Sequence, residues 1–156
     1  MKHVEVALTQ VGMKEDPIGS NWGSPVKYYL AAVGINFAAS WCMAFVYWCV
    51  EHAGCRIPDG IGGYKNPLIH TGGVLDQWHR IDAKMKFTQP QPGDIFIQDH
   101  GHGLGHTGII ESIDGENIHT IEGNTNDTGS REGYEVCKRV RPVSSCVGFI
   151  RIPQTV

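Results

Sequence analysis

Residues 40–50 read Ser-Trp-Cys-Met-Ala-Phe-Val-Tyr-Trp-Cys-Val, and their pattern predicts a buried helix. The apolar residues of one helical face recur at the required spacing; they are Cys42, Phe45, Val46, Cys49 and Val50. Ser40 is a residue type preferred at the N-cap, so we expect Cys42 in the first turn of this helix.

Cys42 has two interpretations at this position. The free N–H groups and the positive end of the helix dipole favour an anion in the first turn, and a thiolate is the nucleophilic form of cysteine. A cysteine can also open the apolar stripe of a core helix as a small buried residue. A nucleophile would need a base from elsewhere in the chain.

Helical patterns fill the first half of the chain and strand patterns fill the second. We expect helices over residues 4–11, 25–33, 41–53 and 74–78. The connection over residues 55–73 is rich in Gly and Pro, and connections of this length are usually functional or mobile. Strand patterns cover residues 94–98, 107–112, 117–122, 134–140 and 147–152. Asp114-Gly115 predicts a hairpin between the second and third of these strands.

This order of elements predicts an α+β fold. We expect N-terminal helices packed on a C-terminal antiparallel sheet of about five or six strands. The chain has 156 residues, of which 41% are hydrophobic and 19% charged, as is typical of a globular domain. No repeat, low-complexity tract or linker divides it, so we expect a single domain over residues 1–156.

Charge and hydropathy exclude several classes of partner. A net charge of -3 is unlike the basic excess of a sequence-independent nucleic-acid binder, and it provides no polybasic patch for anionic lipid. No apolar run approaches the length of a membrane span. We therefore expect neither a nucleic-acid nor a membrane partner. We also expect a monomer.

The cysteines and the N-terminal segment indicate the cellular compartment in which the protein is made. Five cysteines are an odd number, so a complete disulfide framework is impossible and reduced thiols are expected, although Cys137 and Cys146 could pair. Glu5 and Gln10 interrupt the N-terminal segment, which lacks the apolar stretch of a secretory signal. We expect a protein made in the cytoplasm that reaches any external substrate by another route.

His106 is the candidate base for Cys42. It begins an apolar strand in Gly-His-Thr-Gly-Ile-Ile, residues 105–110, and an imidazole with a pKa of about 6.5 can accept and return a proton near neutral pH. Glu122 and Asn124 end the next strand. A tight antiparallel hairpin returns the end of that strand to the start of the first, which predicts that Glu122 or Asn124 lies beside His106 and holds its tautomer. A plain polar turn at residues 122–124 is the alternative.

Four motifs in order resemble the CHAP domain, a family of cysteine, histidine-dependent amidohydrolases/peptidases related to NlpC-type and papain-like enzymes. They are Trp41-Cys42-x-x-Phe45-Val46, Pro92-Gly93-Asp94-Ile95, Gly105-His106-Thr107-Gly108 and Glu122-Gly123-Asn124-Thr125. The resemblance runs from about residue 4 to residue 152, nearly the whole chain. It implies a papain-like fold and a site formed by Cys42, His106, Glu122 and Asn124.

The resemblance also implies a reaction and a substrate. The expected reaction is thioester-forming cleavage of an amide in bacterial peptidoglycan, either at the glycan–peptide link or within the stem or bridge peptide. Such an enzyme suits a phage endolysin or a secreted effector, acting on the wall after lysis or specialised export. We expect Trp41, Asn21 and Trp22 to contact substrate, and no cofactor or metal. The segment Gly34–Ser40 has no carboxylate, which makes the calcium loop of some members improbable.

Three alternatives remain open. His100, His102 and His106 could form a catalytic zinc site, although four glycines in residues 99–108 argue against a rigid ligand cage. A non-catalytic cell-wall-binding module could use the same fold. Relatives of this fold also cleave small peptide–polyamine amides, so the chemistry could be retained with another substrate.

Overall fold

The computed structural model describes residues 1–123 and 133–154. Its helices are α1 (Lys2–Gln10), α2 (Val26–Ala32), α3 (Cys42–His52) and α4 (Val74–Arg80), with short 3-10 turns η1 (Ala83–Met85) and η2 (Val143–Ser145). Its strands are β1 (Ile57–Pro58), β2 (Tyr64–Lys65), β3 (Lys86–Phe87), β4 (Ile95–Gly101), β5 (Leu104–Asp114), β6 (Asn117–Gly123), β7 (Val136–Pro142) and β8 (Gly148–Ile150).

Helix α3 lies at the centre of the fold. It packs against α1, α2, β5 and β6, and nearly all of its side chains are buried, as its apolar sequence predicts. The N-cap is Trp41 and not Ser40, because the carbonyl of Trp41 already accepts the first helical hydrogen bond, from Phe45 N. The prediction for Ser40 is therefore wrong by one residue, while Cys42 does lie in the first turn.

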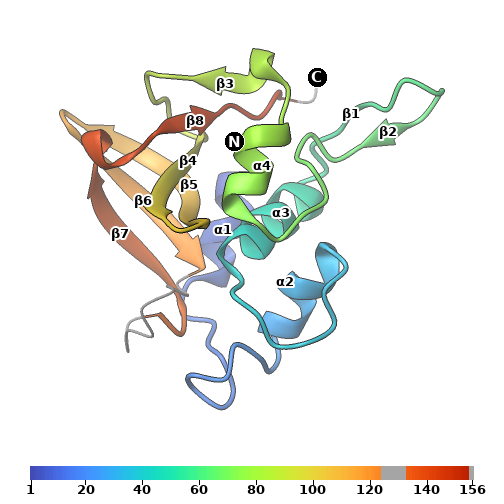
Figure 1. Ribbon diagram of the computed structural model, residues 1–156, viewed down its shortest axis with the longest axis vertical. Helices are drawn as coiled ribbons and strands as arrows, with labels where there is room; N and C mark the ends of the chain where they lie inside the picture. The colour runs from blue at the N-terminus through green and yellow to red at the C-terminus, as the bar shows by residue number, and fades with distance from the viewer. Residues whose placement is uncertain (124–132, 155–156) are drawn as a thin grey trace.

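The described strands form an antiparallel sheet in the order β3-β8-β4-β5-β6-β7, and a separate β1-β2 pair. Figure 1 shows the helices on one side of this curled sheet and the β1-β2 hairpin extending away from it. The predicted α+β class is confirmed, as is the hairpin at Asp114-Gly115, where Asp114 pairs with Asn117. The two-residue strands β1, β2 and β3 were not predicted.

Isoleucines from successive strands make up much of the interface between the sheet and α3. Ile95, Ile109 and Ile121 face one another across β4, β5 and β6, and they join the core that includes Phe45 and Val46 of α3. Burial of each such side chain stabilises the fold by roughly 1.5–3 kcal/mol. This interface fixes the start of α3 relative to β5 and β6.

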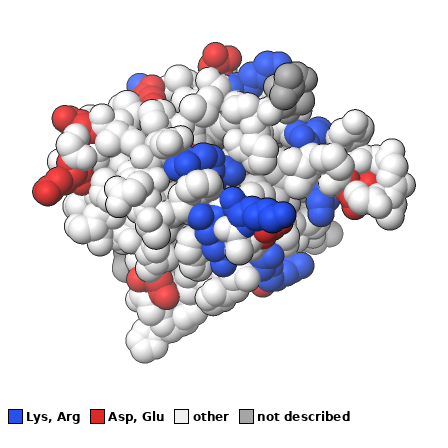
Figure 2. Space-filling view, turned by 90° about the horizontal axis from the view of Figure 1, so that it is seen from above, with Lys and Arg blue, Asp and Glu red and all other residues white. Residues whose placement is uncertain are grey.

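Charge is unevenly distributed over the surface. On the face seen from above, Lys and Arg side chains gather near the middle, while Asp and Glu lie mainly toward the rim (Figure 2). The net charge of -3 therefore does not describe every face. Among residues 1–123 and 133–154, every helix is too short or too polar to cross a membrane.

Candidate active site

Cys42 is the first residue of α3 and is 5% exposed. The N–H groups of the first turn have no partner within an α-helix, and they carry the positive end of the helix dipole. Cys42 thus lies at the end of α3 that carries the partial positive charge of the helix.

His106 and Glu122 come from neighbouring strands and are both buried. His106 lies in β5 and Glu122 in β6, and His106 Nε2 is 2.6 Å from Glu122 Oε1. Because Ile109 pairs with Ile121, Glu122 faces Gly108, two residues along β5 from His106. This diagonal spacing is within reach of a long side chain. The hairpin was predicted to bring Glu122 or Asn124 beside His106, and the structure places Glu122 there.

Gly108 leaves the space that this contact requires. A Cβ atom at residue 108 would lie 2.6 Å from Glu122 Cγ and 2.7 Å from Phe96 Cε2. Real Cβ atoms do not approach other atoms so closely, so a larger residue would displace Glu122 or Phe96. The glycine therefore lets the Glu122 side chain pass over residue 108 and reach His106, which lies on the same strand.

Further donors hold the Glu122 carboxylate in place. Arg141 Nε lies 2.6 Å from Oε2 and Arg141 Nη2 lies 2.7 Å from Oε1, so the guanidinium binds both oxygens. Thr120 Oγ1 donates to Oε2 at 2.6 Å. Together with His106, these groups satisfy a carboxylate that has no solvent exposure.

These contacts change the ionisation of the pair. Burial raises the pKa of Glu122, but hydrogen bonds and charges from Arg141 and His106 outweigh burial and lower this pKa to about 2. Burial lowers the pKa of His106, but contacts with Cys42 and Glu122 outweigh burial and raise this pKa to about 9. Both shifts favour the charged pair, an imidazolium beside a carboxylate.

The two nitrogens of His106 have different surroundings. Nε2 is committed to Glu122, whereas Nδ1 is buried and has no hydrogen-bond partner of standard geometry within residues 1–123 and 133–154. The Cys42 side chain acts on the same ring and raises its pKa. Nδ1 is thus the ring nitrogen left for the thiol. Glu122 fixes the Nε2–H tautomer of the neutral ring, so that Nδ1 can act as the base.

The structure does not support a substrate contact for Trp41. Its side chain is completely buried, stacks on Tyr29 at 5.7 Å and donates from Nε1 to Glu15 Oε2 at 2.7 Å. A side chain without exposed surface cannot receive a ligand, so this prediction is corrected: Trp41 is a core residue that anchors the start of α3.

The other predicted site residues have different outcomes. Asn21 and Trp22 are half-buried in the loop before α2, and their contact with substrate stays a prediction. Asn124 lies outside the described residues. All five cysteines are free thiols, so Cys137 and Cys146 are not paired.

The three histidines of the zinc alternative do not form a ligand set. His100 Nε2 lies 3.2 Å from Gln98 Oε1, and His106 is engaged by Glu122. In the part of the chain that the structure describes, no group of three or more His, Cys, Asp or Glu side chains could hold a metal ion. The geometry thus favours His106 as the base for Cys42 over His106 as a zinc ligand.

Arg141, Thr120 and Glu15 were missed by the sequence reasoning. The pairing of Thr120 with Arg139 and of Ile118 with Arg141 places Arg141 on the same face of the sheet as Glu122. Two arginines alternating along a strand next to a buried acid could have indicated a charge partner. The signal depends on the β6–β7 register, which the sequence leaves open.

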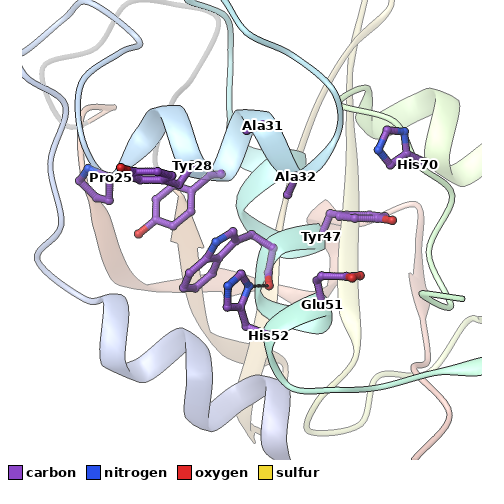
Figure 3. Close-up of a pocket in the computed structure, with 10 residues that line it drawn as sticks. Pro25, Tyr28, Ala31, Ala32, Tyr47, Glu51, His52 and His70 are labelled. Atoms are coloured by element: carbon purple, nitrogen blue, oxygen red, sulfur yellow. Dashed lines mark hydrogen bonds between the residues drawn. The ribbon is translucent and has the colours of Figure 1, made fainter.

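A cavity of about 710 Å³ lies elsewhere, between α2 and α3 (Figure 3). Tyr28, Tyr47, Glu51 and His70 are among its lining residues, whereas Cys42, His106 and Glu122 are not. His52 stacks on Trp48 at 3.9 Å in its wall. The candidate chemistry therefore does not lie in this cavity.

Comparisons with known proteins agree with the observed fold and with the family that the sequence resembles. A family model described as CHAP domain matches residues 34–124. No curated protein matches the chain.

Among solved structures, the crystal structure of Ly7917 has a TM-score of 0.55 at 17% identity, covering 97% of this chain and 61% of that one. The structure of Ly7917 with the hydrolyzing product of MDP has a TM-score of 0.54 at 16% identity, covering 97% and 62%. The chain spans less than two thirds of the length of these structures.

Proposed function

The chain belongs to the CHAP domain family, and from this premise we propose that it is a cysteine-dependent hydrolase that cleaves an amide bond of bacterial peptidoglycan. The observation that carries the proposal is the buried constellation of Cys42, His106 and Glu122. The nucleophile, the base and the orienting acid come from three different elements. The base lies between the other two, as acyl transfer requires.

The first half of the proposed reaction forms a thioester. The Cys42 thiolate, paired with imidazolium His106, attacks the carbonyl carbon of the scissile amide. The carbonyl oxygen becomes an oxyanion that the Cys42 backbone N–H, at the start of α3, can hold. His106 Nδ1 then gives its proton to the amide nitrogen. The C–N bond breaks, the amine departs and the acyl group stays on sulfur.

The second half releases the acid. Neutral His106 keeps the proton on Nε2, toward Glu122 Oε1, and its Nδ1 removes a proton from a water molecule. The hydroxide adds to the thioester carbonyl, and the C–S bond breaks as the tetrahedral intermediate collapses. The product carboxylic acid leaves, and the thiolate–imidazolium pair is restored.

Two observations support peptidoglycan as the substrate. The family model carries the amidohydrolase/peptidase class to this chain. A solved structure of the same fold is described with the hydrolyzing product of MDP, and MDP abbreviates muramyl dipeptide, a peptidoglycan fragment. The proposed place of action is the cell wall, reached after lysis, as by an endolysin, or through specialised export.

Mass spectrometry of peptidoglycan digests tests the proposal. Purified sacculi are incubated with wild type and with Cys42→Ser, and the soluble muropeptides are compared. We expect wild type to release fragments with one new amine and one new carboxylate per cut, and Cys42→Ser to release none. The new termini identify the bond as a muramoyl–alanine or a peptide amide.

Two controls make the result specific. Cys146→Ser changes another thiol and should keep full activity, and EDTA should leave activity intact while iodoacetamide abolishes it. The proposal fails if wild type binds sacculi without releasing new termini, which is the behaviour of a binding module. It also fails if Cys42→Ser cleaves at the wild-type rate.

A further inference from the structure

Arg141 reaches the candidate site from β7 and contacts Glu122, the acid that orients His106. Its guanidinium binds both oxygens of Glu122, at 2.6 and 2.7 Å, while its side chain is 26% exposed. We propose that Arg141 is a positioning residue, whose two parallel hydrogen bonds fix the plane of the Glu122 carboxylate and keep it ionised for His106. The inference rests on the proposed thiol chemistry and deepens it.

The geometry of the carboxylate supports this role. Oε1 accepts from both His106 and Arg141, and Oε2 accepts from both Arg141 and Thr120. A carboxylate with both oxygens shared in this way cannot rotate without breaking several charge-assisted bonds at once. The direction of the Glu122–His106 bond, and hence of Nδ1, is therefore set in part by Arg141.

The charge of Arg141 has a second effect. Glu122 is completely buried, and a buried carboxylate without a cation tends to take up a proton. His106 supplies a cation only while it is protonated, and it has to release that proton during the reaction. Arg141 stays charged throughout, so Glu122 stays ionised when His106 is neutral. The guanidinium also packs 5.8 Å from the centre of the Phe96 ring, which lies 6.0 Å from the His106 ring.

A second arginine of the chain provides a matched control. Arg151 binds both oxygens of Asp94 at 2.9 Å, and Asp94 is 1% exposed. This pair repeats the Arg141–Glu122 arrangement, but none of its hydrogen bonds involves His106 or Cys42. Replacing Arg151 therefore measures what the loss of such a pair costs the fold, without the effect on the candidate site.

The experiment compares Arg141→Met, Arg141→Lys and Arg151→Met with wild type. The first readout is the rate of alkylation of Cys42 by iodoacetamide from pH 3 to 10, quantified at the Cys42 peptide by mass spectrometry. The second is the pH profile of kcat and KM on purified sacculi. Thermal melts verify that each variant is folded at the assay temperature.

We expect Arg141→Met to lower kcat by about 10- to 100-fold with little change in KM, because a misdirected base slows proton transfer more than binding. The acidic limb should move to higher pH in both profiles, that of the Cys42 alkylation rate and that of kcat. The reason is that Glu122 then protonates more readily. Arg141→Lys should restore the acidic limb, since it keeps the charge, but only part of kcat, since an ammonium cannot form the two parallel bonds.

Two outcomes would overturn the inference. One is an Arg141→Met variant whose acidic limb coincides with that of wild type. The other is an Arg151→Met variant whose limb moves as far as that of Arg141→Met. The alkylation readout needs no substrate, so the inference is tested even if sacculi are not cleaved and the proposed function fails.

Discussion

His106 Nε2 and Glu122 Oε1 lie 2.6 Å apart in a region where both side chains are almost inaccessible to solvent. Two oppositely charged groups at this distance, shielded from water, direct each other more strongly than an exposed pair would. The orientation of His106 is therefore a property of the hairpin that carries both residues.

Glu122→Gln should lower kcat/KM on sacculi by about 100- to 10,000-fold, within the range for loss of an orienting acid. The amide nitrogen would point its hydrogens at donors from His106, Arg141 or Thr120, so at least one bond is lost. Release of new amino groups measures the rate. Glu116→Gln, an exposed substitution at the other end of the same hairpin, should match wild type. A Glu122→Gln rate within threefold of wild type would contradict an orienting role.

The pKa of His106 predicts how stability depends on pH. This pKa is raised to about 9 in the folded protein, from 6.5, so the stabilising contribution of the protonated ring is complete below pH 6.5 and is lost as pH rises through 9. Glu122 has the opposite sign: its pKa is lowered to about 2 from 4.5, so its contribution is complete above pH 4.5 and is lost as pH falls through 2.

Thermal melts of wild type and His106→Gln across pH 3 to 10 check the first of these signs. The difference in melting temperature should be largest below pH 6.5 and should shrink toward pH 9. A difference for His106→Gln that grows between pH 6.5 and 9 would show that the folded protein holds the neutral ring.

Local patterns were sufficient to predict α3 and to narrow the partner of His106 to Glu122 or Asn124. The helix follows from apolar spacing over residues 42–50, and the two candidate partners follow from a tight turn that fixes which strand positions meet. Both depend on residues close together in the sequence.

Contacts between distant segments were not predictable in the same way. Arg141 reaches Glu122 only through the β6–β7 register, and the connection between Gly123 and Val136 is too long for a tight turn to fix that register. Strand β3 exists because Lys86 and Phe87 pair with β8, more than sixty residues later. The buried indole of Trp41 donates to Glu15, which lies in a loop that carries no periodic pattern. Long-range pairing of this kind overrides local propensity.

Gly108→Ala should both destabilise the fold and reduce activity. The new methyl group would meet Glu122 Cγ at 2.6 Å, Phe96 Cε2 at 2.7 Å and the Ile121 carbonyl oxygen at 2.9 Å. Overpacking of this kind costs roughly 1–3 kcal/mol in the free energy of unfolding, measured by urea titration. Displacement of Glu122 should also lower kcat, about 10-fold or more.

Gly148→Ala separates these two effects. Its methyl group would meet the ring of Trp78 in α4, another severe contact at the same sheet but away from Glu122. We expect a comparable loss of stability with kcat retained at temperatures where the protein is folded. If Gly108→Ala retained kcat as well, the space beside Glu122 would not be needed for catalysis.

The Glu15–Trp41 hydrogen bond links the loop before α2 to the residue that precedes Cys42. Glu15 is 3% exposed, and its other oxygen accepts from Gly19 N at 2.9 Å. Glu15→Ala removes this acceptor from a buried indole N–H, so we expect a loss of about 1–3 kcal/mol in the free energy of unfolding. Glu5→Ala, at an exposed position of α1, should change stability by no more than about 0.5 kcal/mol.

A double-mutant cycle with Glu15→Ala and Trp41→Phe isolates the bond from the packing that each substitution also removes. The coupling energy should reach about 1 kcal/mol or more, because the acceptor is a buried charged group. Both single variants should also change the rate at which iodoacetamide alkylates Cys42, since Trp41 caps the helix that positions this thiol. Additive stabilities together with an unchanged alkylation rate would mean that the loop does not hold the start of α3.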